Sequence, residues 1–349
     1  MEKKSIAILF GGVSAEYPVS LQSAHAVITH LDTARYVPVL VGITQQGHWF
    51  RYRGDAARIL DDTWCNPHHC TPAFISPCRQ HAGLVEFGTG VTVFTRLDAA
   101  FPVMHGTFGE DGTVQGLLEL AGIPIVGCGT LASAACMDKN VAHKLLQAAG
   151  IAVPQSATFG GSTDFTEIEA AAKALGFPLF VKPVRAGSSF GVSRVANATG
   201  LAGAVQKAFL YDDHLLLEEA IDGFEVGCAV LGNKDLTIGA LDEIELAGGF
   251  FDYTEKYNLV TSKIHVPARL PAEKTDEIKQ IAANIYRLLG CKGFARVDMF
   301  VTPEGRVVFN EVNTVPGFTP HSRYPTMMQA VGLDFTAVVD RLVTLAVAP

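Results

Sequence analysis

Apolar and polar positions near the start of the chain predict a strand, a glycine turn and a helix. An apolar run extends from Ser5 to Phe10 and ends at Gly11 and Gly12. Beyond the glycines, apolar side chains recur at helical spacing, at Leu21, Ala24, Ile28 and Leu31. Further apolar runs read VPVLVGI, GVTVF and AAFPVMHG, with helical stretches between them. This alternation is typical of a doubly wound parallel sheet, so we expect an α/β domain over residues 1–127.

The pattern then changes and predicts a small α+β domain over residues 128–214. Asp138 is placed to cap a helix that ends at Gly150, and a second helix ends at Gly176. The strand PLFVKPV follows and leads into a glycine and serine loop at Ala186–Gly191. In this region the strands no longer alternate regularly with helices, which favours an α+β arrangement.

Residues 215–349 predict a third domain, also α+β. It opens with the strands LLLEEAI, FEVGCAVLG and LTIGALDEIEL, and a later helix ends at Gly290. A last amphipathic helix repeats apolar side chains at Phe335, Val338, Val339, Leu342 and Leu345. Residues 247–265 have no regular period, which indicates a long functional loop or lid.

The composition favours a folded enzyme and excludes some partners. Of the 349 residues, 48% are hydrophobic and 18% are charged, which is ample for packed cores. The net charge of -8 gives no overall attraction for nucleic acid or an anionic membrane, so any phosphate must be bound locally. No apolar run reaches the roughly 20 residues of a membrane span, and the start lacks a signal-peptide pattern. The seven cysteines fit reduced thiols, so we expect a cytoplasmic protein.

The sharpest arrangement of chemical groups lies in GFARVDMFVTPEGRVVFNEVNTVPG, at residues 293–317. A turn centred on Glu304 and Gly305 would fold this stretch into a β-hairpin. Because side chains alternate between the faces of a strand, two opposed pairs would then share one face. These pairs are Asp298 with Glu311 and Arg296 with Asn313.

Opposed carboxylates repel each other unless a cation lies between them. Oxygen ligands from Asp298, Glu311 and Asn313 suit Mg²⁺ bound together with nucleotide phosphates. The alternative is a solvated polar face on an edge hairpin. The apolar side chains of the two strands argue against simple exposure, and they are Val297, Met299, Val308 and Val312.

Phosphate binding must rely on groups other than a P-loop, because the sequence has no GxxxxGK[ST] motif. Lys139 at a helix start, Lys182 at a strand end and Lys256 in the candidate lid can supply positive charge. Ser188 and Ser189 lie in a glycine-flanked loop whose N–H groups can wrap a triphosphate. The alternatives are ordinary surface lysines and an ordinary hairpin turn.

Two polar stretches lie where strands of an open α/β sheet end, which is where such sheets bind ligands. One is HGTFGEDG at His105–Gly112, with an imidazole, two acids and three glycines. The other holds Glu16, whose place at the carboxyl end of a strand favours a substrate role. The alternative is structural, because acids at helix starts, such as Glu110 and Asp111, stabilise a helix N-terminus.

Two weaker motifs match known sites poorly. Cys65–Cys70, with Cys78 beyond, is spaced irregularly for zinc and favours a surface hairpin. Gly127, Gly129 and Ala132 form only a broken GxGxxG. A nicotinamide-dependent oxidoreductase would need the full motif and an acid about 20 positions on. A non-catalytic nucleotide-binding module would lack the metal ligands that are present here.

Several blocks of sequence, in family order, resemble the D-alanine:D-alanine ligase family of the ATP-grasp fold. They are GGVSAE, HGTFGEDGTVQG, MDK, VKPVRAGSSFGVS, FFDYTEKY and RVDMF followed by NEVNTVPG. The resemblance extends over essentially the full length. Phe309 replaces the leucine or isoleucine more usual in the family, and it remains apolar.

The resemblance implies that ATP binds between the central and C-terminal domains with two Mg²⁺ ions, which Mn²⁺ can replace. The metal ligands would be Asp298, Glu311 and Asn313. The ATP contacts would be Lys139, Lys182, Ser189, Glu218, Ala220, Ile221, Glu225 and Lys256. It further implies small-molecule substrates and a homodimer.

The resemblance also implies which groups act on the amino acids. The catalytic set would be Glu16, Ser188, Tyr257, Arg296, Gly317 and Ser322, and the substrate contacts would include His105 and Arg323. Glu16 would bind the ammonium of the first D-alanine and form a hydrogen-bonded triad with Ser188 and Tyr257. Arg296 and the Gly317 N–H would stabilise an oxyanion. The first carboxylate would attack the γ-phosphate, and the second amine would attack the resulting acyl phosphate. The lid would exclude water from that intermediate.

The acceptor is expected to be an amino acid, because family members that make the D-lactate ester resemble each other in having histidine at the position of Tyr257. Tyr17 in SAEYPVS, the lid sequence and Arg323 in HSRYP look most like the D-alanine:D-serine ligases of vancomycin resistance. D-Alanine as acceptor is the alternative, since a pocket distinguishes an extra hydroxyl by only a few kcal/mol.

Overall fold

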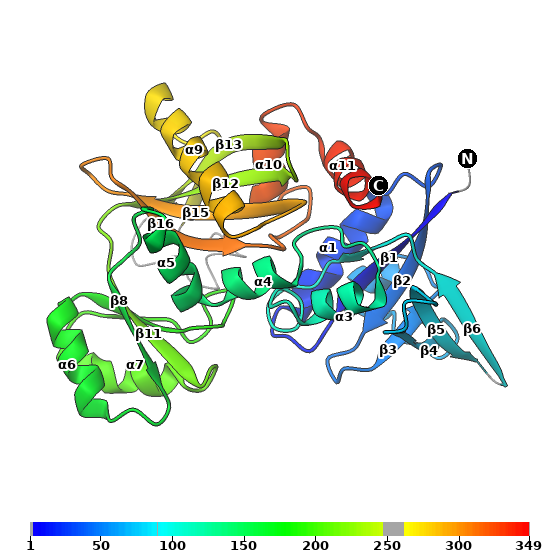
Figure 1. The fold of residues 1–349 in the computed structure, drawn as a ribbon, viewed down its shortest axis with the longest axis horizontal. Helices are drawn as coiled ribbons and strands as arrows, with labels where there is room; N and C mark the ends of the chain where they lie inside the picture. Colours follow the sequence, from blue (N-terminus) through cyan, green and yellow to red (C-terminus); the bar gives the residue numbers. More distant parts are fainter. Residues whose placement is uncertain (1–2, 89, 247–261, 349) are drawn as a thin grey trace.

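The computed structural model describes residues 3–88, 90–246 and 262–348, which form three lobes (Figure 1). The first lobe holds a seven-stranded sheet, the second a four-stranded sheet and the third a five-stranded sheet. Helices cover the sheets, so the predicted α/β and α+β fold class is confirmed. In the described part of the chain, no helix combines the length and apolar character that crossing a membrane requires.

The first lobe is a mixed sheet with the strand order β6-β5-β4-β3-β2-β1-β7. Its parallel strands are β1 (Lys4–Gly11), β2 (Tyr36–Ile43) and β7 (Ala99–Pro102). Its antiparallel strands are β3 (Trp49–Tyr52), β4 (Cys70–Ile75), β5 (Gly83–Gly88) and β6 (Val91–Arg96). Its helices are α1 (Tyr17–His30), α2 (Ala57–Leu60) and α3 (Thr113–Ala121).

The prediction of a wholly parallel sheet was wrong for the strands from β3 to β6. Parallel neighbours need a crossover connection of about a dozen residues or more, usually with a helix. The link between β5 and β6 spans only residues 89–90, which permits only an antiparallel pair. GVTVF therefore forms an exposed edge strand instead of a buried parallel one.

The second lobe is an antiparallel sheet with its own hydrophobic core. Its strands are β8 (Ser156–Gly160), β9 (Leu179–Pro183), β10 (Ser193–Val195) and β11 (His214–Glu219). It is covered by α6 (Phe165–Leu175), the short helix η1 (Ala198–Gly200) and α7 (Leu201–Ala208). The predicted end of α6 at Gly176 is confirmed by the left-handed φ of +85° there.

Two helices connect the lobes in Figure 1, α4 (Thr130–Met137) and α5 (Lys139–Ala148). The predicted cap of α5 is confirmed, because the Asp138 side chain accepts a hydrogen bond from the Val141 N–H. Their buried side chains join the core of the third lobe. The proposed domain limits at residues 127 and 214 stay predictions.

The third lobe is an antiparallel sheet with the strand order β14-β13-β12-β15-β16. These strands are β12 (Phe224–Gly232), β13 (Leu236–Leu246), β14 (Ser262–His265), β15 (Phe294–Val301) and β16 (Val307–Asn313). Its helices are α9 (Ala272–Leu288), α10 (Arg323–Gln329) and α11 (Phe335–Val347). The predicted loop 247–265 wrongly includes residues 262–265. These residues form β14, which pairs with β13 and places Lys263 opposite Glu245. Residues 247–261 lie outside the described residues.

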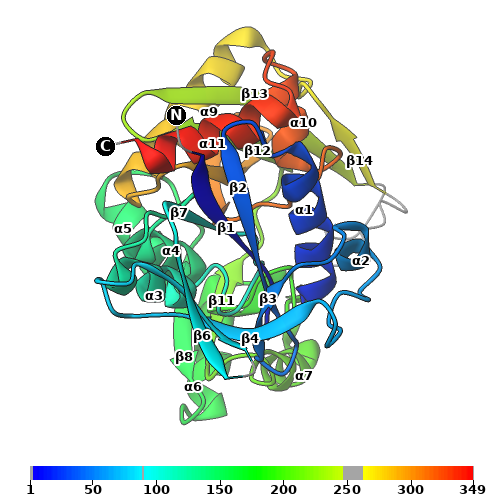
Figure 2. The ribbon, with the colours of Figure 1, turned by 90° about the vertical axis from the view of Figure 1, so that its right-hand side faces the viewer.

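One hydrophobic cluster joins the first and third lobes. It combines β1, β7 and α1 with α10 and α11, and Phe318 and Phe294 lie within it. The two ends of the described chain meet in this region in Figures 1 and 2, and the Lys4 Nζ donates to the Val347 carbonyl at 3.0 Å. The first and third lobes therefore form one packed block, against which the second lobe is set.

A close backbone contact also joins these lobes. Gly127 and Gly293 approach so closely that a Cβ at Gly293 would lie 2.8 Å from the Gly127 Cα. Both glycines have positive φ, which a side chain disfavours. The broken glycine motif around Gly127 thus serves backbone packing.

Gly293→Ala tests this contact, with Gly290→Ala as its matched control. Both positions have φ near +70°, but a Cβ at Gly290 would meet nothing within 4 Å. The control should lower the free energy of unfolding by about 1 kcal/mol through backbone strain alone. Gly293→Ala should cost about 1–3 kcal/mol more, because atoms must also move apart. Urea denaturation measures both, and equal losses would rule out the contact as a constraint.

Candidate functional site

The predicted pairing of the hairpin is confirmed. Asp298 lies opposite Glu311, and Arg296 lies opposite Asn313. The Arg296 Nε donates to Asp298 at 2.8 Å, and the Asn313 Nδ2 donates to Asp298 at 3.0 Å, so these side chains share one face. Asp298 is fully buried.

The hairpin reaches this register through a β-bulge that the sequence did not predict. Met299 lies opposite Phe309, which leaves Asn310 as an extra residue in β16. The turn is accordingly centred on Glu304 alone, and the predicted centre between Glu304 and Gly305 was wrong by half a residue. Phe309 faces the apolar core under α9, and without the bulge Glu311 would face that core too.

Buried arginines balance the acids on this face. Arg323 donates to Asp242 through its Nε at 2.6 Å and its Nη2 at 2.9 Å, and it also lies 3.4 Å from Asp298. Burial by itself raises the pKa of the Asp242 carboxyl, but Arg323 and Arg296 hold this pKa below its usual range. The ion pairs therefore keep Asp242 charged although it is fully buried.

The donor set of the hairpin fits a divalent metal. Two carboxylates, Asp298 and Glu311, and the amide of Asn313 come from adjacent strands, and hard cations such as Mg²⁺ take oxygen ligands of this kind. Glu311 lines the main cavity and also a small cavity beside it that Asn313 lines. The chemistry and placement of these residues are consistent with metal binding next to a bound phosphate.

A cavity of about 890 Å³ lies between the second and third lobes. Seven of the eight predicted ATP contacts line it, namely Lys139, Lys182, Ser189, Glu218, Ala220, Ile221 and Glu225. The eighth, Lys256, lies outside the described residues. Phe180, Phe224, Ile244 and Phe300 add apolar walls suited to a flat ring. Glu311 is also part of the lining, which places a candidate metal ligand at the cavity wall.

Both lysines in this cavity have partners. Lys182 forms a short ion pair with Glu218, whose side chain is buried. The Lys139 Nζ donates to the Ala186 carbonyl at 2.9 Å and so holds the start of the glycine and serine loop. The lysines are thus positioned by acceptors on the chain itself.

The structure brings Glu16 and Ser188 together across the first and second lobes, as predicted, because the Ser188 hydroxyl donates to the Glu16 carboxylate. Glycines make room for this contact, since a Cβ at Gly106 or Gly187 would lie 2.4 or 2.8 Å from a Glu16 oxygen. Ser188 and Ser189 have φ of +47° and +59°, a strained backbone that is common at binding loops. Tyr257, the third predicted member, lies outside the described residues.

The other predicted substrate residues lie around the loop after β16. Both ring nitrogens of His105 are occupied, by the Ser23 hydroxyl at 3.0 Å and the Val315 carbonyl at 2.8 Å. Burial lowers the pKa of His105 and favours the neutral ring. Gly317 and Ser322 are neighbours, since a Cβ at Gly317 would lie 3.4 Å from the Ser322 Oγ. These substrate roles stay predictions.

Tyr17 points into the first lobe. Its hydroxyl donates to Asp62 at 2.8 Å and accepts from the Trp64 ring N–H at 3.0 Å. Burial, the largest cause, raises the pKa of Tyr17. The side chain is buried, so any effect of Tyr17 on the acceptor is indirect.

Sequence reasoning assigned no site role to Glu110 or Asp242. The Glu110 carboxylate accepts from the Gly106 N–H at 2.8 Å and the Val315 N–H at 3.0 Å, so it bridges two loops of the site. Burial, together with the charges of Glu16 and Glu311, raises the pKa of Glu110 to about 8. The motif HGTFGEDG pointed to this region, but spacing alone could not separate a bridging acid from a helix cap.

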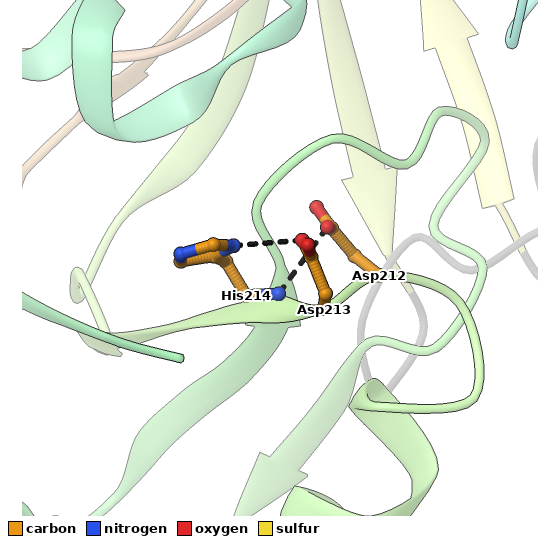
Figure 3. Close-up of side chains that lie close together, drawn as sticks. All are labelled: Asp212, Asp213 and His214. Atoms are coloured by element: carbon orange, nitrogen blue, oxygen red, sulfur yellow. Dashed lines mark hydrogen bonds and ion pairs between the residues drawn. The ribbon is translucent and has the colours of Figure 1, made fainter. Parts of the chain in front are cut away.

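Another cluster resembles a metal site only superficially. Asp212, Asp213 and His214 lie close together in Figure 3, and each offers one donor atom, all three within 4.8 Å of one another. Arg185 forms ion pairs with both aspartates, which supplies the charge that a cation would otherwise provide. The weak zinc motif at Cys65–Cys70 ends the connection between the antiparallel strands β3 and β4 and includes the first residue of β4, and this connection also contains α2.

The three lobes, with a nucleotide-sized cavity between the second and third, define an ATP-grasp fold. Family models for the N-terminus and the C-terminus of D-Ala-D-Ala ligase match residues 5–128 and 145–344. The chain therefore belongs to the D-alanine–D-alanine ligase family. Membership makes it an ATP-dependent ligase that acts on small-molecule substrates.

Individual relatives cover nearly the whole chain. The crystal structure of VanG D-Ala:D-Ser ligase from Enterococcus faecalis has a TM-score of 0.92 and 50% identity, covering 99% of this chain and 100% of that one. Vancomycin C-type resistance protein VanC1 from Enterococcus gallinarum is 44% identical over 98% of both chains. A D-alanine–D-alanine ligase from Caldicellulosiruptor bescii is 42% identical over 99% of this chain and 96% of its own.

Glu110→Gln should change how stability depends on pH. The folded-state pKa of Glu110 lies above its ordinary value of 4.5, so its carboxyl stabilises the fold most at low pH and loses this contribution as pH rises to about 8. The variant carries a constant cost from one altered hydrogen bond but lacks this titration. Its stability relative to wild type should rise by about 1 kcal/mol or more between pH 5 and 8. Urea denaturation in EDTA measures this, and a flat difference would contradict the shift.

Proposed function

We propose that the protein joins D-alanine to D-serine through a D-alanyl phosphate, with ATP cleaved to ADP and phosphate. The observation that carries this proposal is the cavity between the second and third lobes, whose lining combines two lysines with the acids Glu218, Glu225 and Glu311. The product would serve peptidoglycan precursor synthesis and vancomycin resistance. The enzyme would act in the cytoplasm as a homodimer.

In this proposal, ATP lies in the cavity with its base between the apolar walls. Lys139 and Lys182 face the phosphates, Ala220 and Ile221 follow β11 beside the base, and Glu225 faces the ribose. Ser189 and its loop cover the phosphates from the second lobe. Lys256 and the remaining lid belong to residues 247–261. The γ-phosphate would then point toward the hairpin, where Glu311 lines the same cavity.

Asp298, Glu311 and Asn313 would hold two Mg²⁺ ions, with Mn²⁺ as a substitute. The bound cations would neutralise charge on the transferred phosphoryl group. Arg296 already contacts Asp298, so its guanidinium is fixed beside the ligand set. This position suits stabilisation of the oxyanion that forms when the second amine attacks.

Glu16 would bind the ammonium of the first D-alanine. Its carboxylate lies between Gly106 and Gly187 and accepts from Ser188, so the acid is oriented before substrate arrives. Preorganised groups of this kind lower the cost of placing two reactants together. Ser188 would also hydrogen-bond with Tyr257. The Gly317 N–H and Ser322 would face the acceptor.

Arg323 supports D-serine as the acceptor. Asp242 and Glu225 hold its guanidinium in a buried network next to Asp298. Such a network offers polar contacts where an acceptor with a hydroxyl gains more than one with a methyl group. VanG, described as a D-Ala:D-Ser ligase, is similar over 99% of this chain, although a relative described as a D-alanine–D-alanine ligase is similar too. D-Alanine is therefore the alternative acceptor.

Glu311→Gln should reduce ATP turnover by about 100-fold or more, because the metal set loses one carboxylate. The matched control is Glu304→Gln in the exposed turn of the same hairpin, which should remain active. ADP release in the presence of D-alanine and D-serine measures the effect, and thermal unfolding checks the fold. Near-normal turnover by Glu311→Gln would exclude the metal role.

Acceptor choice can be measured directly in one assay. D-Serine, D-alanine and D-lactate compete at equal concentration in the presence of D-alanine as first substrate and ATP, and the products are separated by mass. We expect the D-alanyl-D-serine product to dominate and the ester with D-lactate to be negligible. Efficient use of D-alanine alone would overturn the D-serine assignment and leave the ligase function intact.

A further inference from the structure

A buried histidine lies behind the ion pair of the nucleotide cavity. His143 is on α5, its side chain is 3% exposed, and its Nε2 has no hydrogen-bond partner within the described chain. This nitrogen lies 3.8 Å from the Glu218 Oε2. Buried polar atoms in native proteins are almost always hydrogen-bonded, so an unpartnered one that faces a carboxylate needs an explanation.

The two carboxylate oxygens of Glu218 have different neighbours. Its Oε1 accepts from the Lys182 Nζ, and its Oε2 faces His143. Glu218 is 2% exposed, and a buried carboxylate that loses its cation becomes strongly unfavourable. Lys182 lines the cavity, whereas His143 is no part of the lining. The two groups thus approach the same carboxylate, one from the ligand side and one from the protein side.

A bound phosphate changes this balance. The Lys182 ammonium is a single charge, and a phosphate in the cavity competes with Glu218 for it. Any shift of Lys182 toward phosphate weakens its bond to Glu218. A second donor behind Glu218 would limit that loss.

We propose that His143 is a positioning residue that donates a hydrogen bond to the Glu218 carboxylate when the Lys182 ammonium moves from Glu218 toward a nucleotide phosphate. This inference rests on the proposed binding of ATP in the cavity. It assigns to His143 an effect on nucleotide affinity that is exerted through Glu218 and Lys182, without any contact between His143 and the nucleotide.

The surroundings of the ring suit this role. The His143 Nδ1 lies 3.4 Å from the Ser156 Oγ, which can donate to it and so leave the proton on Nε2, the nitrogen that faces Glu218. The Phe309 ring packs edge-on at 5.9 Å between ring centres and restricts the tilt of the imidazole. A small rotation is then enough to bring the Nε2–H within hydrogen-bonding distance of Glu218.

Three substitutions of His143 distinguish the loss of its Nε2–H donor from the loss of its packing. Glutamine places its amide nitrogen near the position of the histidine Nε2, whereas asparagine places it near Nδ1, and leucine has no donor. For His143→Asn and His143→Leu, the dissociation constant of ADP and the KM for ATP should rise about tenfold, with a much smaller change in kcat. His143→Gln should restore values within about threefold of wild type. Calorimetric ADP binding and steady-state kinetics measure both, and thermal unfolding confirms that each variant is folded.

Two results for ADP affinity would contradict the positioning role of His143. If His143→Gln weakens ADP as much as His143→Leu, or if none of the three changes ADP affinity, the positioning role is wrong. Lys182→Met tests the proposed function on which the inference depends. If Lys182→Met binds ADP and ATP like wild type, the placement of nucleotide fails; if it loses affinity while the His143 variants do not, only the inference about His143 fails.

Discussion

One extra residue in β16 decides which side of the third sheet carries the acid pair. With Asn310 bulged out, Phe309 packs under α9 while Glu311 faces the cavity. The irregularity is stabilised from outside the sheet, because the Phe309 N–H donates to the Ala152 carbonyl at 2.9 Å. Bulges are common next to active sites because they re-aim a side chain without ending the strand. The linker between α5 and β8 therefore helps to position the candidate metal ligand Glu311.

The second constraint is the burial of charge around Asp298. Removing one member of a buried ion pair leaves the other uncompensated, so such sets are stable only when complete. Here Asp298 contacts Arg296 and Arg323, and Arg323 in turn is held by Asp242 and Glu225. The cavity residue Glu225 and the candidate metal ligand Asp298 are thus connected through Arg323. A substitution at any member will alter the positions of the rest.

Sequence reasoning predicted the parts of the fold that local signals determine. The cap of α5 and the glycine ends of α5 and α6 follow from residues close together in the chain, and so does the apolar stripe of α11. The antiparallel direction of β3 to β6 was missed because short apolar runs look alike in parallel and antiparallel sheets. The bulge was missed because a regular hairpin, with its turn centred between Glu304 and Gly305, also pairs Asp298 with Glu311.

Roles that depend on distant partners were beyond local patterns. Glu110 acts on Val315, which is 205 positions away, and Arg323 donates to Asp242, which is 81 positions away. Neither acid differs in sequence from an ordinary helix cap or strand residue. The glycine and serine loop was found because glycine marks unusual backbone, but its contact with Glu16 also spans two lobes.

Charge balance bears on the choice of acceptor. Arg323 and Arg296 face three carboxylates, those of Asp242, Asp298 and Glu225, so this corner of the site carries excess negative charge. Under the proposed function, an acceptor side chain that donates a hydrogen bond would gain there, whereas a methyl group would not. Selectivity for D-serine would therefore arise from the third lobe, next to the metal ligands, where the new bond forms.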